Sequence, residues 1–301
     1  MSVHKTVLLQ ETIEGLNLKS DSTVLDGTFG GGGHSLGICK KFSKSNLNVK
    51  IIALDQDKSV YKEEDKFKDC SISFVNDNFR NIDKVLGETK VDGIIFDLGL
   101  SSDQLENSGR GFSFMKDEPL FMTMKDIKDN LPSSEDVTAH EVVNTWGEES
   151  LADIIYGYGE ERQARRIAKA IVESRKRQEI KTTFDLVKII EDTIPARFRR
   201  GKIHFATKTF QAIRIAVNDE LGAIGEGLDK GFAALRTGGR IAVISFHSLE
   251  DRIVKKFYKI KEKEGKGILI NKKVILASKE EIKNNPRSRS AKLRILEKIK
   301  I

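Results

Sequence analysis

The chain has 301 residues, of which 39% are hydrophobic and 32% charged, and its formal net charge is +7. This length allows one large domain or two modest ones, and the positive charge favours a protein that meets a polyanion through local patches. No run approaches the roughly twenty apolar residues that span a bilayer, and the N-terminus has no signal-peptide core. We therefore expect a cytosolic protein without membrane contact.

The cysteines and histidines are scattered along the chain. Cys39 and Cys70 have no C-x-x-C spacing, so the sequence favours two buried thiols over a disulfide or a zinc cluster. The five histidines have no metal-ligand spacing either, and we expect no metal site. They are His4, His34, His140, His204 and His247.

Short apolar runs bounded by turn residues predict strands in the first third of the chain. The runs are 24–26, 51–55, 71–75 and 93–98. Helix-compatible segments separate them, and this alternation predicts an α/β fold with a parallel sheet and crossover helices.

The pattern changes after the fourth strand. From about residue 104 to 205 there is helical periodicity with polar loops, which is too long for a crossover. Strand patterns return at 238–246, 268–276 and 291–299, and the last two resemble an antiparallel pair. We expect one doubly wound domain, residues 1–105 and 206–301, interrupted by a helical insertion, residues 106–205.

The most informative segment, T-V-L-D-G-T-F-G-G-G-G-H-S at 23–35, joins a strand to a glycine-rich turn. The strand ends at Asp26, and the turn allows the backbone to approach a ligand closely. Asp55 ends the next strand, where an acid suits the two hydroxyls of a ribose. These features predict a nucleoside-containing cofactor at the carboxyl edge of the sheet.

The glycine spacing separates two cofactor classes. It does not match the G-x-G-x-x-G pattern that presents a helix N-terminus to a pyrophosphate. Asp26 also suits a cationic ligand better than a phosphate. S-adenosylmethionine has an adenosine, a positive sulfonium and no phosphate, so the sequence favours it, with an NAD-dependent oxidoreductase as an alternative.

Basic residues gather at several places in the insertion. Helical periodicity at 160–177 gives one apolar face and a basic stripe of Arg162, Arg166 and Lys169. A second group, around Phe198, consists of Arg197, Arg199, Arg200 and Lys202. One such cluster is typical of a solvated face, but several beside a cofactor domain favour contact with phosphates.

The segment T-K-T-F-Q-A-I-R-I-A-V-N-D-E-L, residues 207–221, predicts a helix with one apolar face. Its opposite stripe holds Gln211, Arg214 and Asn218. These side chains suit a contact with substrate or with the other domain as well as plain solvation, and the sequence leaves these possibilities open.

Two strings, D-L-G-L-S-S-D-Q-L at 97–105 and S-G-R-G-F-S-F at 108–114, begin a resemblance that runs almost from end to end. The other strings that carry it are H-K-T-V-L-L-Q-E, D-G-T-F-G-G-G-G-H-S, N-T-W-G-E-E-S-L-A-D-I-I, Y-G-E-E-R-Q-A-R-R-I-A-K-A-I, T-F-Q-A-I-R-I-A-V-N-D-E-L, I-S-F-H-S-L-E-D-R-I-V-K and N-P-R-S-R-S-A-K-L-R. On these residues the chain resembles the bacterial small-subunit ribosomal RNA cytosine-N4 methyltransferases, the MraW family.

The resemblance implies a Rossmann-like class I methyltransferase sheet with a helical insertion that recognises RNA. It implies S-adenosylmethionine as donor and a cytidine in the decoding region of the small-subunit rRNA as acceptor, in free rRNA or in the assembled small subunit. Carried over residue by residue, the cofactor contacts are Gly32, Gly33, His34, Asp55, Phe79, Asp97 and Gln104.

The chemistry of these residues suits the roles that the resemblance implies. Asp55 can accept both ribose hydroxyls, and Phe79 can pack on the adenine face. Asp97 is the candidate catalytic residue, because it can accept a hydrogen bond from the cytosine amine. A backbone carbonyl of Leu98 or Gly99 is the alternative acceptor, and Asp97 then only holds the cofactor.

The chain departs from the family pattern after R-G-F-S-F, where D-E-P-L-F-M-T-M-K stands in place of D-G-P-L-D-M-R-M-D. The changed positions are Glu118, Phe121, Thr123 and Lys125, and Asp103 and Phe205 stand where prolines are common. An acid and an arginine are thereby lost from the insertion. The main alternative function is therefore a nonenzymatic rRNA-binding or assembly factor that retains the fold.

Overall fold

The computed structural model describes residues 5–125, 127, 131–133, 135–199, 201 and 203–300. His4, Arg200 and Lys202, which the sequence arguments used, lie outside these residues. The chain forms two compact units: the sheet unit, residues 1–99 and 221–301, and the helical unit, residues 100–220. These limits differ from those expected from the sequence at both ends of the insertion, because segments 100–105 and 206–220 also belong to the helical unit.

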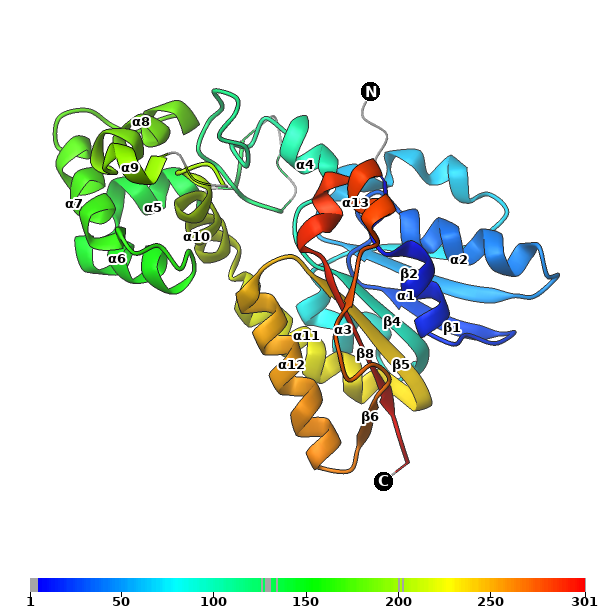
Figure 1. Ribbon diagram of the computed structural model, residues 1–301. Coiled ribbons are helices and arrows are strands. Elements are labelled where there is room, and N and C mark those ends of the chain that lie inside the picture. The colour runs from blue at the N-terminus through cyan, green and yellow to red at the C-terminus, as the bar shows by residue number, and fades with distance from the viewer. Residues whose placement is uncertain are drawn as a thin grey trace. The chain divides into compact units, whose positions relative to one another are not determined.

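The sheet unit contains one sheet with the strand order β3-β2-β1-β4-β5-β8-β6, in which β7 also pairs with β8 (Figure 1). Its strands are β1 (Ser22–Asp26), β2 (Val49–Asp55), β3 (Ser71–Asn76), β4 (Val91–Asp97), β5 (Leu235–Ser245), β6 (Gly267–Leu269), β7 (Ile275–Leu276) and β8 (Lys292–Lys298). The first five pair in parallel, and β8 is antiparallel to β5. The predicted α/β sheet with an insertion after its fourth strand is confirmed.

The predicted continuous strand 268–276 is wrong, because its middle leaves the sheet. Only β6 and β7, at its two ends, pair with β8. Between them, the Asn271 amide donates to the Leu293 carbonyl (3.2 Å) and accepts from the Ile295 N–H (2.8 Å). One side chain thus satisfies two backbone groups that a continuous strand would otherwise pair.

Helices cover both faces of the sheet, because successive residues of a strand point to opposite sides. Leu25, Ile94 and Phe96 pack on one side with residues of α3 (Ile82–Leu86), α11 (Glu220–Ala234) and α12 (Ser248–Lys263). Val24 and Ile95 pack on the other with α1 (Leu9–Gly15) and α2 (Gly33–Ser43). The unit also contains the short elements η1 (Lys58–Phe67), η2 (Phe79–Asn81), α13 (Lys279–Asn284) and η3 (Pro286–Ser290).

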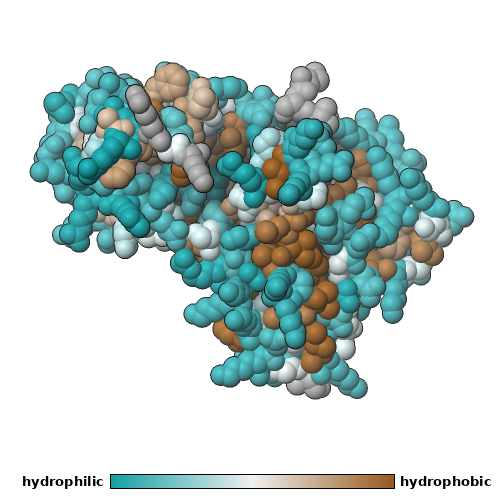
Figure 2. Space-filling view, in the orientation of Figure 1, coloured by the Kyte–Doolittle hydropathy of each residue, from teal (hydrophilic) through white to brown (hydrophobic). Residues whose placement is uncertain are grey.

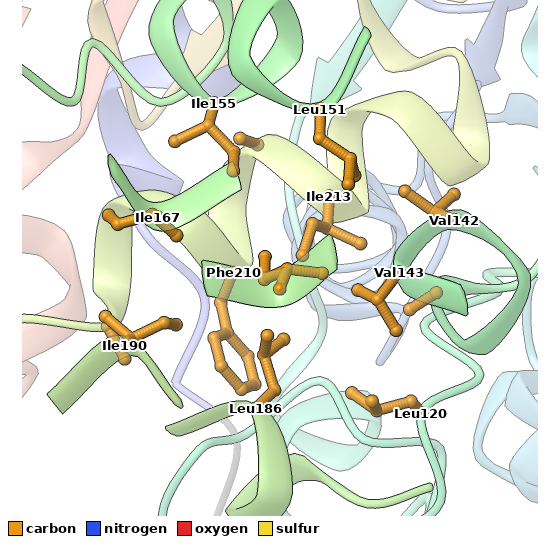
Figure 3. Close-up of a cluster of buried hydrophobic side chains, with 14 of the residues drawn as sticks. Leu120, Val142, Val143, Leu151, Ile155, Ile167, Leu186, Ile190, Phe210 and Ile213 are labelled. Carbon is orange, nitrogen blue, oxygen red and sulfur yellow. The ribbon is translucent and has the colours of Figure 1, made fainter. Parts of the chain in front are cut away.

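The helical unit packs around an apolar core of its own. Its helices are α4 (Ser102–Glu106), α5 (Ala139–Thr145), α6 (Glu148–Gly157), α7 (Ala164–Arg175), α8 (Thr183–Thr193), α9 (Ala196–Arg199) and α10 (Thr207–Asn218). Figure 3 shows side chains of this core pointing toward one another, among them Ile155 of α6, Ile167 of α7 and Ile213 of α10, which are all fully buried. No helix in the described part of the chain is both long and apolar enough to cross a bilayer.

The expectation of two separate thiols is wrong, since Cys39 and Cys70 are joined by a disulfide. Cys39 lies on α2 and Cys70 just before β3, and the fold brings their Cα atoms to 5.7 Å. Neither side chain is fully buried. The two residues are 31 positions apart, so only tertiary packing reveals the pair.

Tyr258 joins α12 to the sheet, because its buried hydroxyl donates to the Ile241 carbonyl at 3.0 Å. We expect Tyr258→Phe to lower the free energy of unfolding by about 1 kcal/mol, since the ring stays and the hydrogen bond is lost. Urea denaturation measures the change. Tyr156→Phe is the control, because Tyr156 is 67% exposed, and equal loss in both variants would contradict the expectation.

Candidate active site

Three acids lie at one edge of the sheet. Asp26, Asp55 and Asp97 are the last residues of β1, β2 and β4. Since β1 lies between the other two strands and all three are parallel, their carboxyl ends meet at the same edge. No lysine or arginine that the structure describes is among the groups that shift the pKa of any of the three.

The glycine turn after β1 is packed too tightly for side chains. Gly32 has a left-handed φ of 68°, and an added Cβ would lie 2.7 Å from the Phe29 and Phe67 rings. A Cβ on Gly33 would lie 1.7 Å from the Thr6 Oγ1. The packing of the chain itself therefore requires both glycines, independently of any ligand.

Two of the acids hold this turn in place. Asp26 is buried and accepts a hydrogen bond from the Ser35 hydroxyl at 2.7 Å. Asp55 accepts from the Gly30 N–H at 2.8 Å and from the Asp57 N–H at 2.9 Å, with one oxygen each. A carboxylate oxygen has a second lone pair, so Asp55 can still accept hydrogen bonds from a ligand.

Asp97 is less completely satisfied than the other two acids. Its side chain keeps 20% of its exposure and lies 3.7 Å from the His34 Nδ1, whose Nε2 lies 3.1 Å from the Val7 carbonyl. The Asp97 Oδ1 is shielded from solvent and has no hydrogen-bond partner among the described residues. A shielded oxygen without a donor suits a ligand that brings one.

Burial raises the pKa of all three carboxyl groups. The pKa of Asp26 and that of Asp55 rise to about 6, because desolvation outweighs the hydrogen bonds that favour the charged form. The pKa of Asp97 rises to about 8, first through desolvation and then through the negative charges of Asp26 and Glu250. A cationic ligand would stabilise the charged forms of these carboxyl groups, which burial destabilises, so the site favours a cation.

Phe79 is the first residue of η2, which follows β3. Its ring centre lies 5.1 Å from that of Phe96, and a Cβ on Gly227 would lie 2.5 Å from it. These contacts make the ring part of the core of the sheet unit. Its contact with an adenine stays a prediction.

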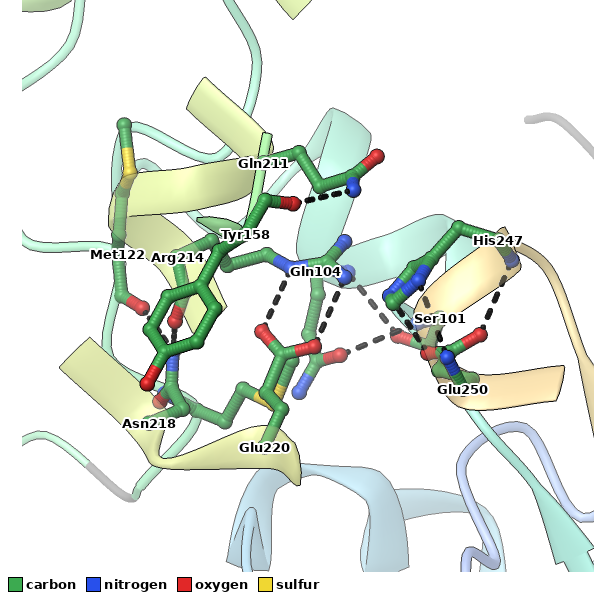
Figure 4. Close-up of polar contacts among 11 residues, drawn as sticks. Ser101, Gln104, Met122, Tyr158, Gln211, Arg214, Asn218, Glu220, His247 and Glu250 are labelled. Atoms are coloured by element: carbon green, nitrogen blue, oxygen red, sulfur yellow. Dashed lines mark hydrogen bonds and ion pairs between the residues drawn. The ribbon is translucent and has the colours of Figure 1, made fainter. Parts of the chain in front are cut away.

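Gln104, the seventh predicted cofactor residue, lies in the helical unit. It closes a capping box at the start of α4, where its backbone N–H donates to the Ser101 hydroxyl and its Oε1 accepts from the Ser101 N–H, both at 3.1 Å (Figure 4). The other six predicted residues all belong to the sheet unit.

The polar stripe of α10 is engaged inside the helical unit (Figure 4). Gln211 donates to the Tyr158 carbonyl at 3.0 Å, and Arg214 makes two hydrogen bonds of 2.7 and 2.9 Å to Glu220. Asn218 donates to the Met122 carbonyl and accepts from the Met124 N–H, both at 2.7 Å. Hydrogen bonds within the helical unit therefore account for the polar side chains on this stripe, without a contact to substrate.

Asn218 therefore anchors the very segment in which the chain departs from the family pattern. Within it, Thr123 is 2% exposed and its hydroxyl accepts from the Lys125 N–H at 3.2 Å. Glu118 accepts from the Gly111 N–H at 3.0 Å, and Lys125 pairs with Asp136. Glu118, Thr123 and Lys125 are thus integrated into the helical unit.

Sequence reasoning missed three residues that shape the site: Thr6, Thr28 and Ser35. The Thr28 hydroxyl accepts from the Asp97 N–H at 2.6 Å, and so links the glycine turn to β4. Thr28 and Ser35 flank the glycines in the sequence, so their short polar side chains were an available signal. Thr6 gave no such signal, because only the fold brings it to Gly33.

A family model described as the MraW methylase family matches residues 1–299. The chain belongs to this family. A curated relative from Clostridium botulinum (strain Kyoto / Type A2), named Ribosomal RNA small subunit methyltransferase H, is 46% identical over 316 residues, covering 98% of this chain and 99% of the relative. A relative of the same name from Clostridioides difficile (strain 630) is 45% identical over 317 residues with the same coverage.

Membership confirms the resemblance to the MraW family that the sequence motifs indicate. The chain is an S-adenosylmethionine-dependent methyltransferase, and the expected donor is confirmed over the NAD alternative. The residues present fit such a donor, because a sulfonium is a cation and the sheet edge holds three acids whose pKa values are not lowered by any lysine or arginine that the structure describes.

Gly33 and Thr6 allow a direct test of the packing of the turn. We expect Gly33→Ala to lower the free energy of unfolding by about 1–3 kcal/mol, because the new methyl group overlaps the Thr6 side chain. Thr6→Gly in the same chain should recover part of this loss, as urea denaturation of both single variants and the double variant will measure. Gly225→Ala is the control, since a Cβ there meets nothing within 4 Å. A Gly33→Ala variant as stable as this control would refute the assigned contact.

Proposed function

We propose that the chain transfers the methyl group of S-adenosylmethionine to the exocyclic N4 of a cytidine in the decoding region of small-subunit ribosomal RNA. The family and the names of the curated relatives support the enzyme class and the RNA substrate over a nonenzymatic factor. The structural observation that carries the proposal is the acid cluster at the sheet edge, with its unpartnered Asp97 Oδ1. A cytoplasmic location forms part of the proposal.

The proposal assigns the cofactor mainly to the sheet unit. Asp55 accepts hydrogen bonds from the ribose hydroxyls, and Phe79 packs on the adenine. Asp97 holds the methionine end together with the turn at Gly32, Gly33 and His34, and Gln104 stays a predicted cofactor contact. The donor supplies a methyl group bound to a positive sulfur, and the acids balance that charge.

The cytosine amine is a weak nucleophile, because its lone pair is delocalised into the ring. A group that accepts one of its hydrogens localises the lone pair and orients it for attack. Asp97 is assigned this role, and the carbonyls of Leu98 and Gly99 are the alternative acceptors at the same strand end. The raised pKa of Asp97 means that it accepts well only after it has ionised, which a cationic donor promotes.

The proposal assigns recognition of the RNA to the helical unit and to basic residues near the C-terminus. The target base has to leave its stack to reach the donor, at a cost of about a few kcal/mol. Arg287 and Arg289 of η3 are suited to hold the RNA backbone meanwhile, and η3 immediately precedes β8 at the carboxyl edge of β5.

Cofactor affinity should depend on pH through Asp97. The pKa of this acid is raised to about 8, and a bound cation favours its ionised form, so binding below that pH releases a proton. We expect the affinity for S-adenosylmethionine to rise by up to about ten-fold per pH unit from about pH 6 and to level off near about pH 8. Calorimetry at several pH values measures this.

The Asp97→Asn variant is the matched control, because an amide does not titrate. Its affinity should be lower and should change less with pH in the same window. A wild-type affinity that falls with rising pH, or a variant with an unchanged slope, would contradict the assignment to Asp97.

Mass spectrometry of rRNA tests the activity itself. In cells that lack this protein, one cytidine of the small-subunit rRNA should lose a methyl group at N4, and the wild-type chain should restore it. In single-turnover assays with purified protein, the Asp97→Asn variant should transfer the methyl group at least about a hundred-fold more slowly than the wild-type chain, because Asp97 is assigned to orient the amine and to hold the donor. An unchanged modification profile in the deletion cells would exclude the proposed function.

A further inference from the structure

Positive charge is unevenly divided between the two units. Residues 221–301 contain 20 Lys and Arg against 9 Asp and Glu, whereas residues 100–220 contain 19 against 21. The helical unit, whose basic clusters pointed to phosphate contact, thus has no net positive charge. The excess belongs to the C-terminal part of the sheet unit.

Much of this excess lies on one face of α12, which we call the basic stripe: Arg252, Lys255, Lys256, Lys259 and Lys263. All five side chains are exposed, whereas Val254 and Tyr258 on the opposite face are buried. The stripe follows from spacings of three and four residues, which bring side chains to the same side of a helix. Figure 2 shows a mostly hydrophilic surface over α12, the orange helix of Figure 1.

Three lysines at the centre of the stripe are not neutralised within the part of the chain that the structure describes. Lys255, Lys256 and Lys259 form no hydrogen bond or ion pair with any residue that the structure describes. Basic residues elsewhere in this region do, because Lys261 pairs with Asp229 and Arg294 pairs with Asp251. These ion pairs of α12 thus involve Asp251 in its first turn and Lys261 near its end, and not the three stripe lysines.

Repulsion between the like charges of the stripe destabilises α12 when no anion is bound. Like charges four positions apart repel, and the lysines of the stripe form two such pairs: 255 with 259, and 259 with 263. Glu262 is the one exposed acid of the helix close to them, since Glu250 is buried and Asp251 is paired. A bound polyanion would relieve this repulsion.

The position of α12 relates the stripe to the active site. The helix begins after β5, whose residue Ile244 lies opposite Asp97 of β4. From this edge the stripe extends along the helix for about 16 Å, at 1.5 Å per residue. The aromatic residues of the helix, Phe257 and Tyr258, pack against the core, so the stripe offers charge without a stacking surface.

We propose that the basic stripe of α12 binds the phosphate backbone of the RNA substrate beyond the target nucleotide. This inference rests on the proposed function for the identity of the RNA. Lysine and arginine without exposed aromatic side chains suit contacts to phosphates, which position an RNA but do not read its sequence. The stripe therefore contributes affinity and orientation, and the choice of base lies elsewhere.

The test replaces Lys255, Lys256 and Lys259 by Gln in the full chain, with Lys40→Gln, Lys41→Gln and Lys44→Gln at the C-terminal end of α2 as the matched control. All six lysines are exposed, and both triple variants remove the same charge. The probe is a fragment of small-subunit rRNA that contains the target cytidine. We expect the stripe variant to bind it at least about ten-fold more weakly at about 100 mM salt, with a salt slope lower by about 2 to 3.

Further measurements separate the possible outcomes. The control triple should retain RNA affinity within about two-fold, and replacement of the three stripe lysines by Arg should preserve binding, because Arg keeps the phosphate-binding charge. Equal losses in the stripe and control triples would show a general charge effect and overturn the proposal. So would unchanged RNA binding combined with stripe-dependent binding to anionic phospholipid vesicles.

The proposed function and the stripe can fail separately. Wild-type protein that methylates the RNA, alongside a stripe variant with wild-type RNA affinity, would overturn the stripe alone. Wild-type protein that transfers no methyl group, alongside a stripe variant that still loses RNA affinity, would overturn the function and support the stripe. Affinity for S-adenosylmethionine should be the same in all variants, which shows that the cofactor site is intact.

Discussion

Three acids with raised pKa values at the end of a parallel sheet, which no lysine or arginine of the described residues offsets, are the constraint on which the site depends. Asp26 and Asp55 accept hydrogen bonds from Ser35, Gly30 and Asp57, and the first two of these donors lie in or directly after the glycine turn. Asp97 lacks such support at its Oδ1, and its pKa is raised to about 8. Below about pH 8 the Asp97 carboxyl of the free protein is therefore mostly protonated. A positively charged ligand favours loss of this proton, so ligand binding and ionisation of Asp97 are coupled.

The glycine turn has to meet two demands at once. It presents backbone to the acids, and it packs against Phe29, Phe67 and Thr6 so closely that Gly32 and Gly33 have no room for a Cβ. The N-terminal segment is therefore part of the site, since Thr6 covers Gly33 and the Val7 carbonyl holds His34. A ligand that displaced the turn would have to move this segment too.

The sequence predicts those features that depend on neighbouring residues, such as the strands, the glycine turn and the acids that end β1, β2 and β4. It does not predict features whose partners lie far along the chain. Asn271 interrupts a strand through bonds to β8, and Cys39 meets Cys70 only in the fold. The polar stripe of α10 was ambiguous because solvent, substrate and Met122 all offer the same hydrogen-bonding groups to Asn218.

The charge distribution separates attraction of RNA from its recognition. A net positive charge acts over about a Debye length, which is about 8–10 Å in physiological salt, and here it belongs to residues 221–301. The helical unit has no such excess, and Arg214 is neutralised by Glu220 within it. Its exposed polar and aromatic groups, such as Phe198 with the Arg197 guanidinium 4.8 Å from its ring centre, act only at contact distance. Discrimination between bases depends on such short-range contacts, so a unit without excess charge can select an RNA that the basic stripe holds without regard to sequence.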